Sequence, residues 1–281
     1  FSEKTKIDKE QCRIAEYSEQ GKYGCYELCG NLVETVTLPD TLEKIGDCAF
    51  YNCRELAEIS LGSRIENVGS DAFMNTRKLE RLILRCRPEE KTGLRQILVQ
   101  IAADIEVVFQ ADEEPTAVIF FPEYYETYDE IAPAHIFGRN ITGEGFRARQ
   151  AFADGVIDVR AYDEIFAKAC AEESEKTLCH MAWKRLAYPY ALGAPARTAY
   201  ENYLQEHLGC LTGTIVGERN IRELKILSGY EKKDGTRLLQ GDAWDAACVL
   251  AAEADWVEGS SCLLEQVAGM RKKRKKERYE L

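Results

Sequence analysis

Two adjacent segments of this chain repeat each other at an offset of 23 residues, and this repeat limits the possible folds more than any other feature. Aligned pairs are Val36 with Ile59, Leu38 with Leu61, Leu42 with Ile65, Ile45 with Val68, Gly46 with Gly69, Ala49 with Ala72, Phe50 with Phe73 and Leu56 with Leu79. A period of this length is typical of solenoids, in which each coil packs on its neighbours. Residues 32–84 are therefore predicted to form a stack.

Within each copy, apolar and polar residues alternate as they do in a β-strand. The apolar pairs are Val36/Leu38, Ile59/Leu61 and Leu82/Leu84. We expect each pair to point inward from a short strand, with Phe50 stacked on Phe73 beneath the strands. Gly46 and Gly69 are expected to form a turn, beside the small Ala49 and Ala72 at a tight corner.

The first copy reads TVTLPDTLEKIGDCAFYNCRELAEISL over residues 35–61. Its strand, Leu-Pro, Ile-Gly, Ala-Phe, Cys and closing Leu follow one another as in the BspA-type leucine-rich repeat, which it resembles. The second copy departs from this pattern, because Gly62 replaces the proline and Thr76 replaces Cys53. The resemblance implies a bacterial leucine-rich-repeat protein that binds a protein or a glycan along the face of its strands.

The stack is expected to have about three to four turns, because neighbouring coils must cover each other. Residues 24–34 look like a worn first copy that caps one end. At the other end, residues 94–103 have helical spacing and residues 105–109 look like a buried strand. The segment 111–115, ADEEP, is a plausible linker.

The chain after this linker predicts a different kind of structure. Residues 116–121 read as a strand, and residues 137–145 contain the glycines of a turn or hairpin. From residue 161 the spacing predicts helices, over 161–171, 175–187, 195–208, 221–227, 242–254 and 259–270. The fold class is therefore α+β: a leucine-rich-repeat domain over 1–110, a mixed junction over 111–160 and an α-helical domain of uncertain family over 161–281.

Bulk composition excludes some classes of partner. A net charge of −11 on 281 residues argues against a general nucleic-acid surface, which needs clustered bases. The exception is a basic run near the end of the chain, for which a solvated tail is the alternative to a phosphate or anionic-lipid contact: Arg271, Lys272, Lys273, Arg274, Lys275 and Lys276. No apolar run reaches the length of a membrane span, and no transmembrane segment is expected.

The eleven cysteines form no C-x-x-C pair. Several lie among alanines and leucines, where a thiol behaves as a small buried hydrophobe. We therefore expect a reducing compartment and a cytoplasmic protein. The sequence starts at Phe1 rather than Met, so a preceding signal peptide, and with it a secreted or surface location, stays open.

No recognised catalytic or cofactor pattern occurs in the sequence. The three histidines, His135, His180 and His207, lack metal-binding spacing. Gly143-x-Gly145 has no lysine of a phosphate loop and is interpreted as a structural turn. We expect no enzyme activity, no metal and no cofactor. The alternative is a hydrolase or transferase with a site at the junction, near residues 124–135 and 139–149.

Two surfaces are candidates for partner binding by a non-enzymatic protein–protein interaction module. One is the outward β-face of the repeat, formed by Thr35, Thr37, Glu58, Ser60, Arg81 and Ile83. The other is the acidic, aromatic junction with Tyr124, Tyr125 and Tyr128, because a tyrosine ring can bury area while its hydroxyl still finds a partner. A protein is the expected partner, and a glycan is possible.

Overall fold

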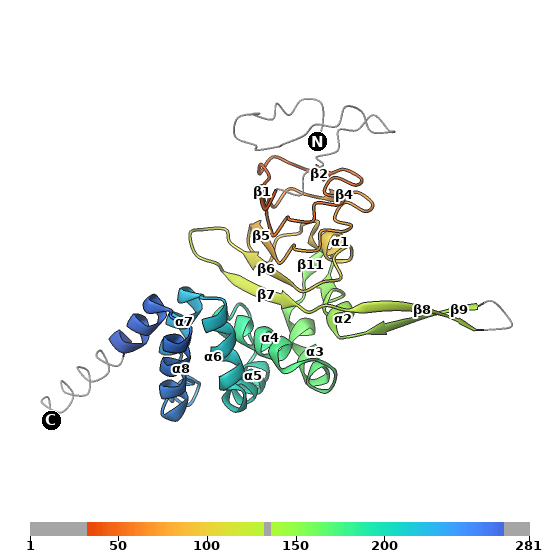
Figure 1. Ribbon diagram of the computed structural model, residues 1–281. Helices are drawn as coiled ribbons and strands as arrows, with labels where there is room; N and C mark the ends of the chain where they lie inside the picture. The colour runs from red at the N-terminus through yellow and green to blue at the C-terminus, as the bar shows by residue number, and fades with distance from the viewer. Residues whose placement is uncertain (1–32, 132–135, 267–281) are drawn as a thin grey trace, which may run out of the picture. The chain divides into compact units, whose positions relative to one another are not determined.

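The computed structural model describes residues 33–131 and 136–266 (Figure 1). They fall into two compact units, one ending at Glu173 and the other beginning at Ser174. A β-solenoid of about three turns is followed by a region of several helices, which confirms the predicted α+β class. The three-part division at residues 110 and 160 stays a prediction.

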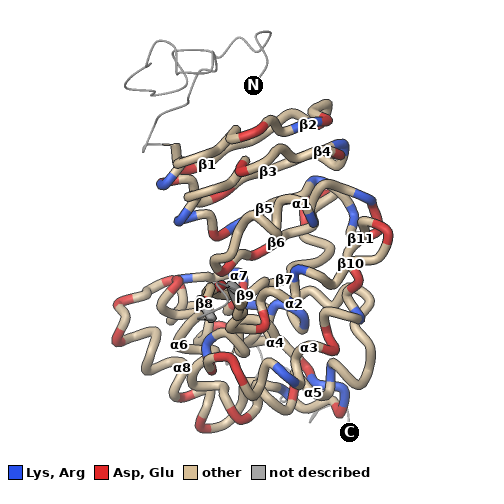
Figure 2. The backbone as a smooth tube through the Cα atoms, turned by 90° about the vertical axis from the view of Figure 1, so that its right-hand side faces the viewer, with Lys and Arg blue, Asp and Glu red and all other residues tan. Residues whose placement is uncertain are grey.

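The solenoid is built on one five-stranded sheet in the order β1-β3-β5-β6-β7. Its first four strands, all parallel, are β1 (Thr35–Thr37), β3 (Glu58–Gly62), β5 (Arg81–Arg85) and β6 (Ile105–Phe109). Val36 pairs with Ile59, and Ile59 with Leu82, so the register equals the sequence period. Figure 2 shows β1, β3 and β5 stacked in parallel.

Two neighbouring coils each contribute one strand to a second, two-stranded parallel sheet, which is formed by β2 (Lys44–Ile45) and β4 (Asn67–Val68). The rings of Phe50 and Phe73 stack with centroids 5.2 Å apart, which confirms the predicted aromatic ladder. A Cβ on Gly69 would lie 2.3 Å from the Asp47 backbone nitrogen. Gly69 is therefore needed for the close approach of two coils. The left-handed turn residues are others, namely Cys48, Asn52, Asp71 and Asn75.

Helix α1 (Leu94–Leu98) covers the last coil where another repeat would have stacked. The Gln96 side chain accepts from Val68 N and donates to Glu66 O, both at 2.9 Å. Gln100 likewise accepts from Phe73 N and donates to Gly69 O. Two glutamine side chains thus satisfy backbone groups that a further coil would have satisfied.

The sheet ends at β7 (Ala117–Phe121), which runs antiparallel to β6. Helix α3 (Val159–Glu172) packs here: the Tyr162 hydroxyl donates to Phe120 O at 2.5 Å and its ring meets Phe121 edge-on. Asp158 caps α3 by accepting from Arg160 N and Ala161 N. The short α2 (Gly145–Ala148) and the hairpin of β10 (Phe152–Ala153) and β11 (Val156–Ile157) connect the two.

Between β7 and α2 the chain forms a long two-stranded hairpin, hereafter the arm. It consists of β8 (Tyr125–Ile131) and β9 (Ile136–Thr142), antiparallel over seven residue pairs. In Figure 1 it runs out from the ends of β7 and α2. The glycines of residues 137–145 do not form its tip: Gly143 makes the turn after β9 at φ +93°. A Cβ on Gly145 would lie 2.0 Å from Pro122 O.

The second unit is helical. Its helices are α4 (Glu175–Ala187), α5 (Ala194–Glu206), α6 (Leu208–Gly217), α7 (Ile221–Gly229) and α8 (Asp242–Glu253), followed by helical residues 257–266. Ser174 caps α4 and Asn220 caps α7. The expected helices are present as far as the described residues reach, which for 259–270 is residue 266, but α6 was not predicted. None of the described helices has the length and apolarity needed to span a bilayer.

Candidate binding surfaces

The β-face carries the predicted residues in two rows that follow the strand register. Thr35, Glu58 and Arg81 form the first row, and Thr37, Ser60 and Ile83 form the second. Glu106 extends the first row, and Arg81 lies 3.7 Å from both Glu58 and Glu106. The first row therefore crosses the strands near their N-terminal ends, and its charge alternates from Glu58 to Arg81 to Glu106.

Ser60 differs from the other predicted β-face residues because it is only 8% exposed. The Arg85 guanidinium lies over it, donating to Ser60 Oγ at 2.5 Å and to Asp40 Oδ1 at 2.7 Å. It also donates to Leu38 O. Arg85 thus ties three successive coils together and shields Ser60.

Gly62 explains how Arg85 reaches this position. A Cβ on Gly62 would lie 2.6 Å from the Asp40 Cα, so only glycine fits beside Asp40. Arg85 pairs with Gly62 in the sheet, and its side chain reaches the same Asp40 that lies against Gly62. Gly62, which replaces the proline of the first copy, is thus the sequence signal that could have pointed to Arg85. The sequence analysis did not identify Arg85, Asp40 or Glu106 as residues of the β-face.

The three tyrosines of the junction have different environments. Tyr124 is 7% exposed, and its ring meets Phe146 at 5.6 Å and the Arg149 guanidinium at 5.1 Å between centres. Burial raises the pKa of Tyr124. Tyr125 and Tyr128, by contrast, are 59% and 62% exposed. Because they are an odd number of residues apart in β8, they lie on opposite faces of the arm.

Arg149 holds the root of the arm in place. It is 1% exposed and donates at 2.5 to 2.9 Å to four backbone carbonyls, those of Ile101, Ala103, Pro122 and Gly145. Burial lowers the pKa of Arg149 to about 10. Since all four bonds are to main-chain groups, Arg149 fixes backbone positions and is not presented to a ligand.

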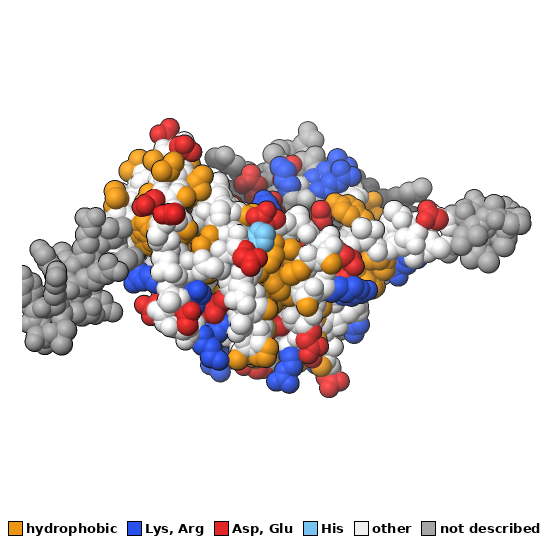
Figure 3. Space-filling view, turned by 90° about the horizontal axis from the view of Figure 1, so that it is seen from below, with side chains coloured by type: hydrophobic (Ala, Val, Ile, Leu, Met, Phe, Trp, Pro, Cys, Tyr) orange, Lys and Arg blue, Asp and Glu red, His pale blue; other side chains and the backbone are white. Residues whose placement is uncertain are grey.

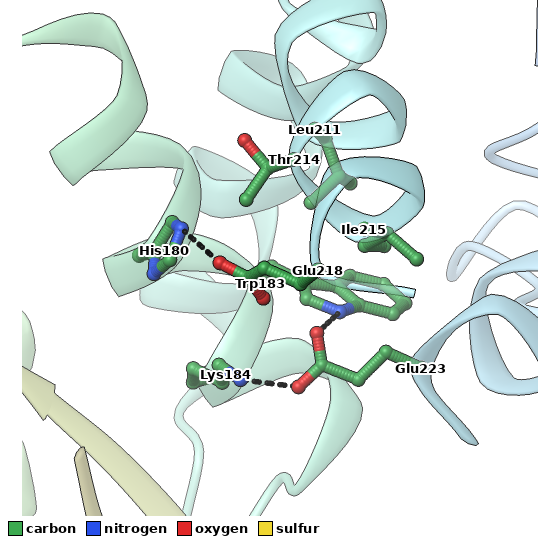
Figure 4. A pocket seen from close by; sticks show the side chains of 8 residues that line it. All are labelled: His180, Trp183, Lys184, Leu211, Thr214, Ile215, Glu218 and Glu223. Atoms are coloured by element: carbon green, nitrogen blue, oxygen red, sulfur yellow. Dashed lines mark hydrogen bonds and ion pairs between the residues drawn. The ribbon is translucent and has the colours of Figure 1, made fainter. Parts of the chain in front are cut away.

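A small, shallow hollow in the second unit is lined by residues of α4, α6 and α7 (Figure 4). Trp183 and Lys184 of α4 both reach Glu223 of α7, the indole nitrogen at 3.1 Å. His180 Nε2 lies 3.6 Å from Glu218 at the rim. Glu223 and Lys184 are both buried and form an ion pair between α7 and α4.

The described residues offer no metal centre for the alternative enzyme. They contain no group of three or more His, Cys, Asp and Glu side chains able to hold a metal. Burial raises the pKa of Cys179, and it raises that of Cys86 to about 12. Thiols of raised pKa are poor nucleophiles at neutral pH. His135 lies outside the described residues.

Comparison with known proteins identifies the repeat. Residues 20–92 match the BspA type Leucine rich repeat region family, in six copies. This region is a BspA-type leucine-rich repeat, and such repeats generally mediate binding and are typically non-catalytic. The matched residues include 24–34, the predicted worn first copy, of which residues 24–32 lie outside the described residues. No curated protein and no solved structure matches the chain.

The basic run from Arg271 to Lys276 also lies outside the described residues.

Proposed function

We propose that the chain is a non-enzymatic binding protein whose repeat stack recognises a protein partner along its β-face. The observation that carries this proposal is the register of β1, β3 and β5, which repeats the 23-residue period and aligns the face in rows. Leucine-rich repeats generally bind along such a face, and the BspA-type match supports the same role. The partner would contact Thr35, Thr37 and Ile83 at accessible or half-buried positions.

The chemistry of the face favours a polar protein surface. Arg81 lies between Glu58 and Glu106, so this row does not present an extended positive or negative electrostatic potential to a partner. Complementary charges on a partner would instead set its register along the strands. A glycan ligand remains the alternative for a small face with hydroxyl groups at Thr35 and Thr37.

A cytoplasmic location is part of the proposal. The eight cysteines among the described residues are free thiols, which supports a reducing compartment. A hydrolase or transferase at the junction is the competing proposal, and it depends on His135 acting together with a cysteine or two carboxylates.

The test uses two paired variants of the full chain. Thr37→Lys with Ile83→Lys changes the β-face. Tyr51→Lys with Met74→Lys adds the same charge at exposed corner positions that are one period apart. Affinity capture from the native cell, with quantitative mass spectrometry, should show a protein lost with the face variant and retained with the corner variant. A captured set unchanged by the face variant contradicts the proposal.

A further inference from the structure

The arm is a β-ribbon that the rest of the described chain leaves uncovered. The described side chains of both its faces are exposed, apart from the half-buried Gly138. Its sheet has two strands only, so β8 and β9 each present one edge without a neighbouring strand. Isolated two-stranded hairpins are marginally stable in water, and exposed edges readily accept another strand. An arm of this kind is therefore built like a docking element.

Several contacts hold the root of the arm. Glu123 N donates to Asp104 Oδ1 at 2.7 Å, just before β8 begins. After the root, Arg139 of β9 lies with its guanidinium 5.3 Å from the Phe146 ring centre. Together with the buried Tyr124 and Arg149, these contacts fix the direction in which β8 leaves the body. A fixed direction reduces the entropy lost when a partner binds.

The charge of the arm is one-sided. Residues 123–130 carry four acids and no base, whereas β9 carries the single base Arg139. Arg139 is already paired with Glu126, and that bond lowers the pKa of the Glu126 carboxyl. Acidic charge therefore remains in excess along β8. Figure 3 shows the arm as a narrow projection with an acidic side chain near its far end.

We propose that the free edge of β8 binds an extended segment rich in Lys and Arg from a partner protein, which adds as a third strand. Backbone hydrogen bonds would hold the segment, as in other cases of strand addition. Its basic side chains would alternate between the two faces, meeting Glu126 and Tyr128 on one and Asp129 and Tyr125 on the other. The exposed tyrosine rings suit cations, which attract aromatic faces.

The edge of β9 is the less suitable of the two. Arg139 lies at its centre and would repel a basic segment, and no acid occurs between residues 136 and 142. Charge thus selects both the edge and the kind of partner. The surface is separate from the β-face, so either proposal can fail without the other.

The test measures binding of a capped decapeptide with alternating Lys and Thr to the full chain, by fluorescence anisotropy at low and at physiological salt. The matched probe replaces every Lys by Gln. Two further probes carry N-methyl groups on alternate backbone nitrogens of the Lys peptide, one on the odd-numbered and the other on the even-numbered residues. The arm variant is Asp129→Asn with Tyr128→Ser. The control variant, Asp112→Asn with Glu113→Gln, removes two exposed acids from the loop before β7.

We expect the unmodified chain to bind the Lys peptide at least tenfold more tightly than the Gln peptide. The arm variant should bind the Lys peptide at least fivefold more weakly than the unmodified chain does. The control variant and Thr37→Lys with Ile83→Lys should bind it as the unmodified chain does. Equal loss in the arm and control variants would show attraction to net negative charge alone and overturn the proposal. Undiminished binding of both N-methylated peptides would overturn strand addition. Concentration-dependent dimerisation that the arm variant abolishes, seen by sedimentation velocity, would make a second copy the occupant and overturn it as well.

Discussion

The repeat stack contains polar contacts between residues one sequence period apart, whereas contacts in the rest of the chain join positions with no such relation. Within the stack, Asn75 bonds to Asn52 at 2.9 Å and Lys78 to Glu55 at 2.5 Å, each across 23 residues. Outside the stack, Trp183 reaches Glu223 across 40 residues, and Arg149 joins carbonyls from distant segments.

The two regions differ in how much of their stability depends on a single residue. Each of these rungs is one of several links between the same two coils, which also share the strand pairing and the Phe50–Phe73 stack, so its loss leaves the other links in place. A buried charge outside the period has no equivalent, and its removal leaves partners that cannot reach water. We therefore expect substitutions to cost most outside the repeat and least on its ladders.

The largest effect is expected for Arg149→Met. Four backbone carbonyls would lose their donor inside the first unit, which should cost at least about 4 kcal/mol of unfolding free energy. Hydrogen exchange of amides in the first unit should report this loss. The three tryptophans, Trp183, Trp244 and Trp256, all lie in the second unit, so their fluorescence midpoint in urea should stay unchanged. The exposed Arg147→Met is the control, and an equal loss there would refute the role of Arg149.

A slightly smaller effect is expected for Lys184→Met, because it leaves the buried Glu223 carboxylate with Trp183 as its other bonded partner. Breaking a buried pair in this way costs about 3 kcal/mol. Tryptophan fluorescence in urea measures it directly. The double variant Lys184→Met with Glu223→Gln should recover at least half of the loss. No recovery would mean that Lys184 stabilises the unit through packing rather than charge.

Within the period, Phe73→Leu should cost about 1 to 1.5 kcal/mol, since it keeps most of the buried volume but removes the ring stack with Phe50. Circular dichroism in urea, which includes the first unit, is the measurement. A cycle with Phe50→Leu should give a coupling energy of about 0.5 kcal/mol or more. Strict additivity of the two losses would show that the stacked geometry contributes nothing.

The smallest effect is expected for Lys78→Gln. The Lys78 side chain is mostly exposed and that of its partner Glu55 is half-buried, so water and salt still screen the pair. We expect no measurable change in the urea midpoint at physiological salt. A clear destabilisation would contradict the view that the rungs are individually unimportant, and it would make the surface ladders a source of cooperativity.

The sequence predicts the stack well because period, strand alternation and register express one constraint. Once Val36 lies beside Ile59, the placement of Phe50 over Phe73 and of the β-face rows follows. The burial of Ser60 does not follow, since it depends on the Arg85 side chain, which reaches across to Ser60, Leu38 and Asp40. A residue in the next strand covers Ser60, and no pattern within its own copy shows this.

Helix α6 and the arm illustrate two other limits. The segment of α6 contains Gly209, Gly213 and Gly217, and glycine disfavours helices unless tertiary packing overrides it. Here Leu211 and Ile215 are 1% exposed and supply that packing. The described side chains of β8 are exposed on both faces, and β8 lacks the alternation of apolar and polar residues that marks a half-buried strand. Arg149 was missed because its four partners come from separate segments.

The antiparallel strand β7 has a consequence for how such a protein can change in length. A parallel solenoid grows by adding coils at an open end, but β7 reverses direction and α3 packs beside it, so growth past Phe109 is blocked. New 23-residue copies can enter only upstream, for example between β3 and β5, where both neighbours are parallel. Enlarging the β-face would thus move the coils upstream of the insertion away from β6, and the segment from β6 to α3 would stay as it is.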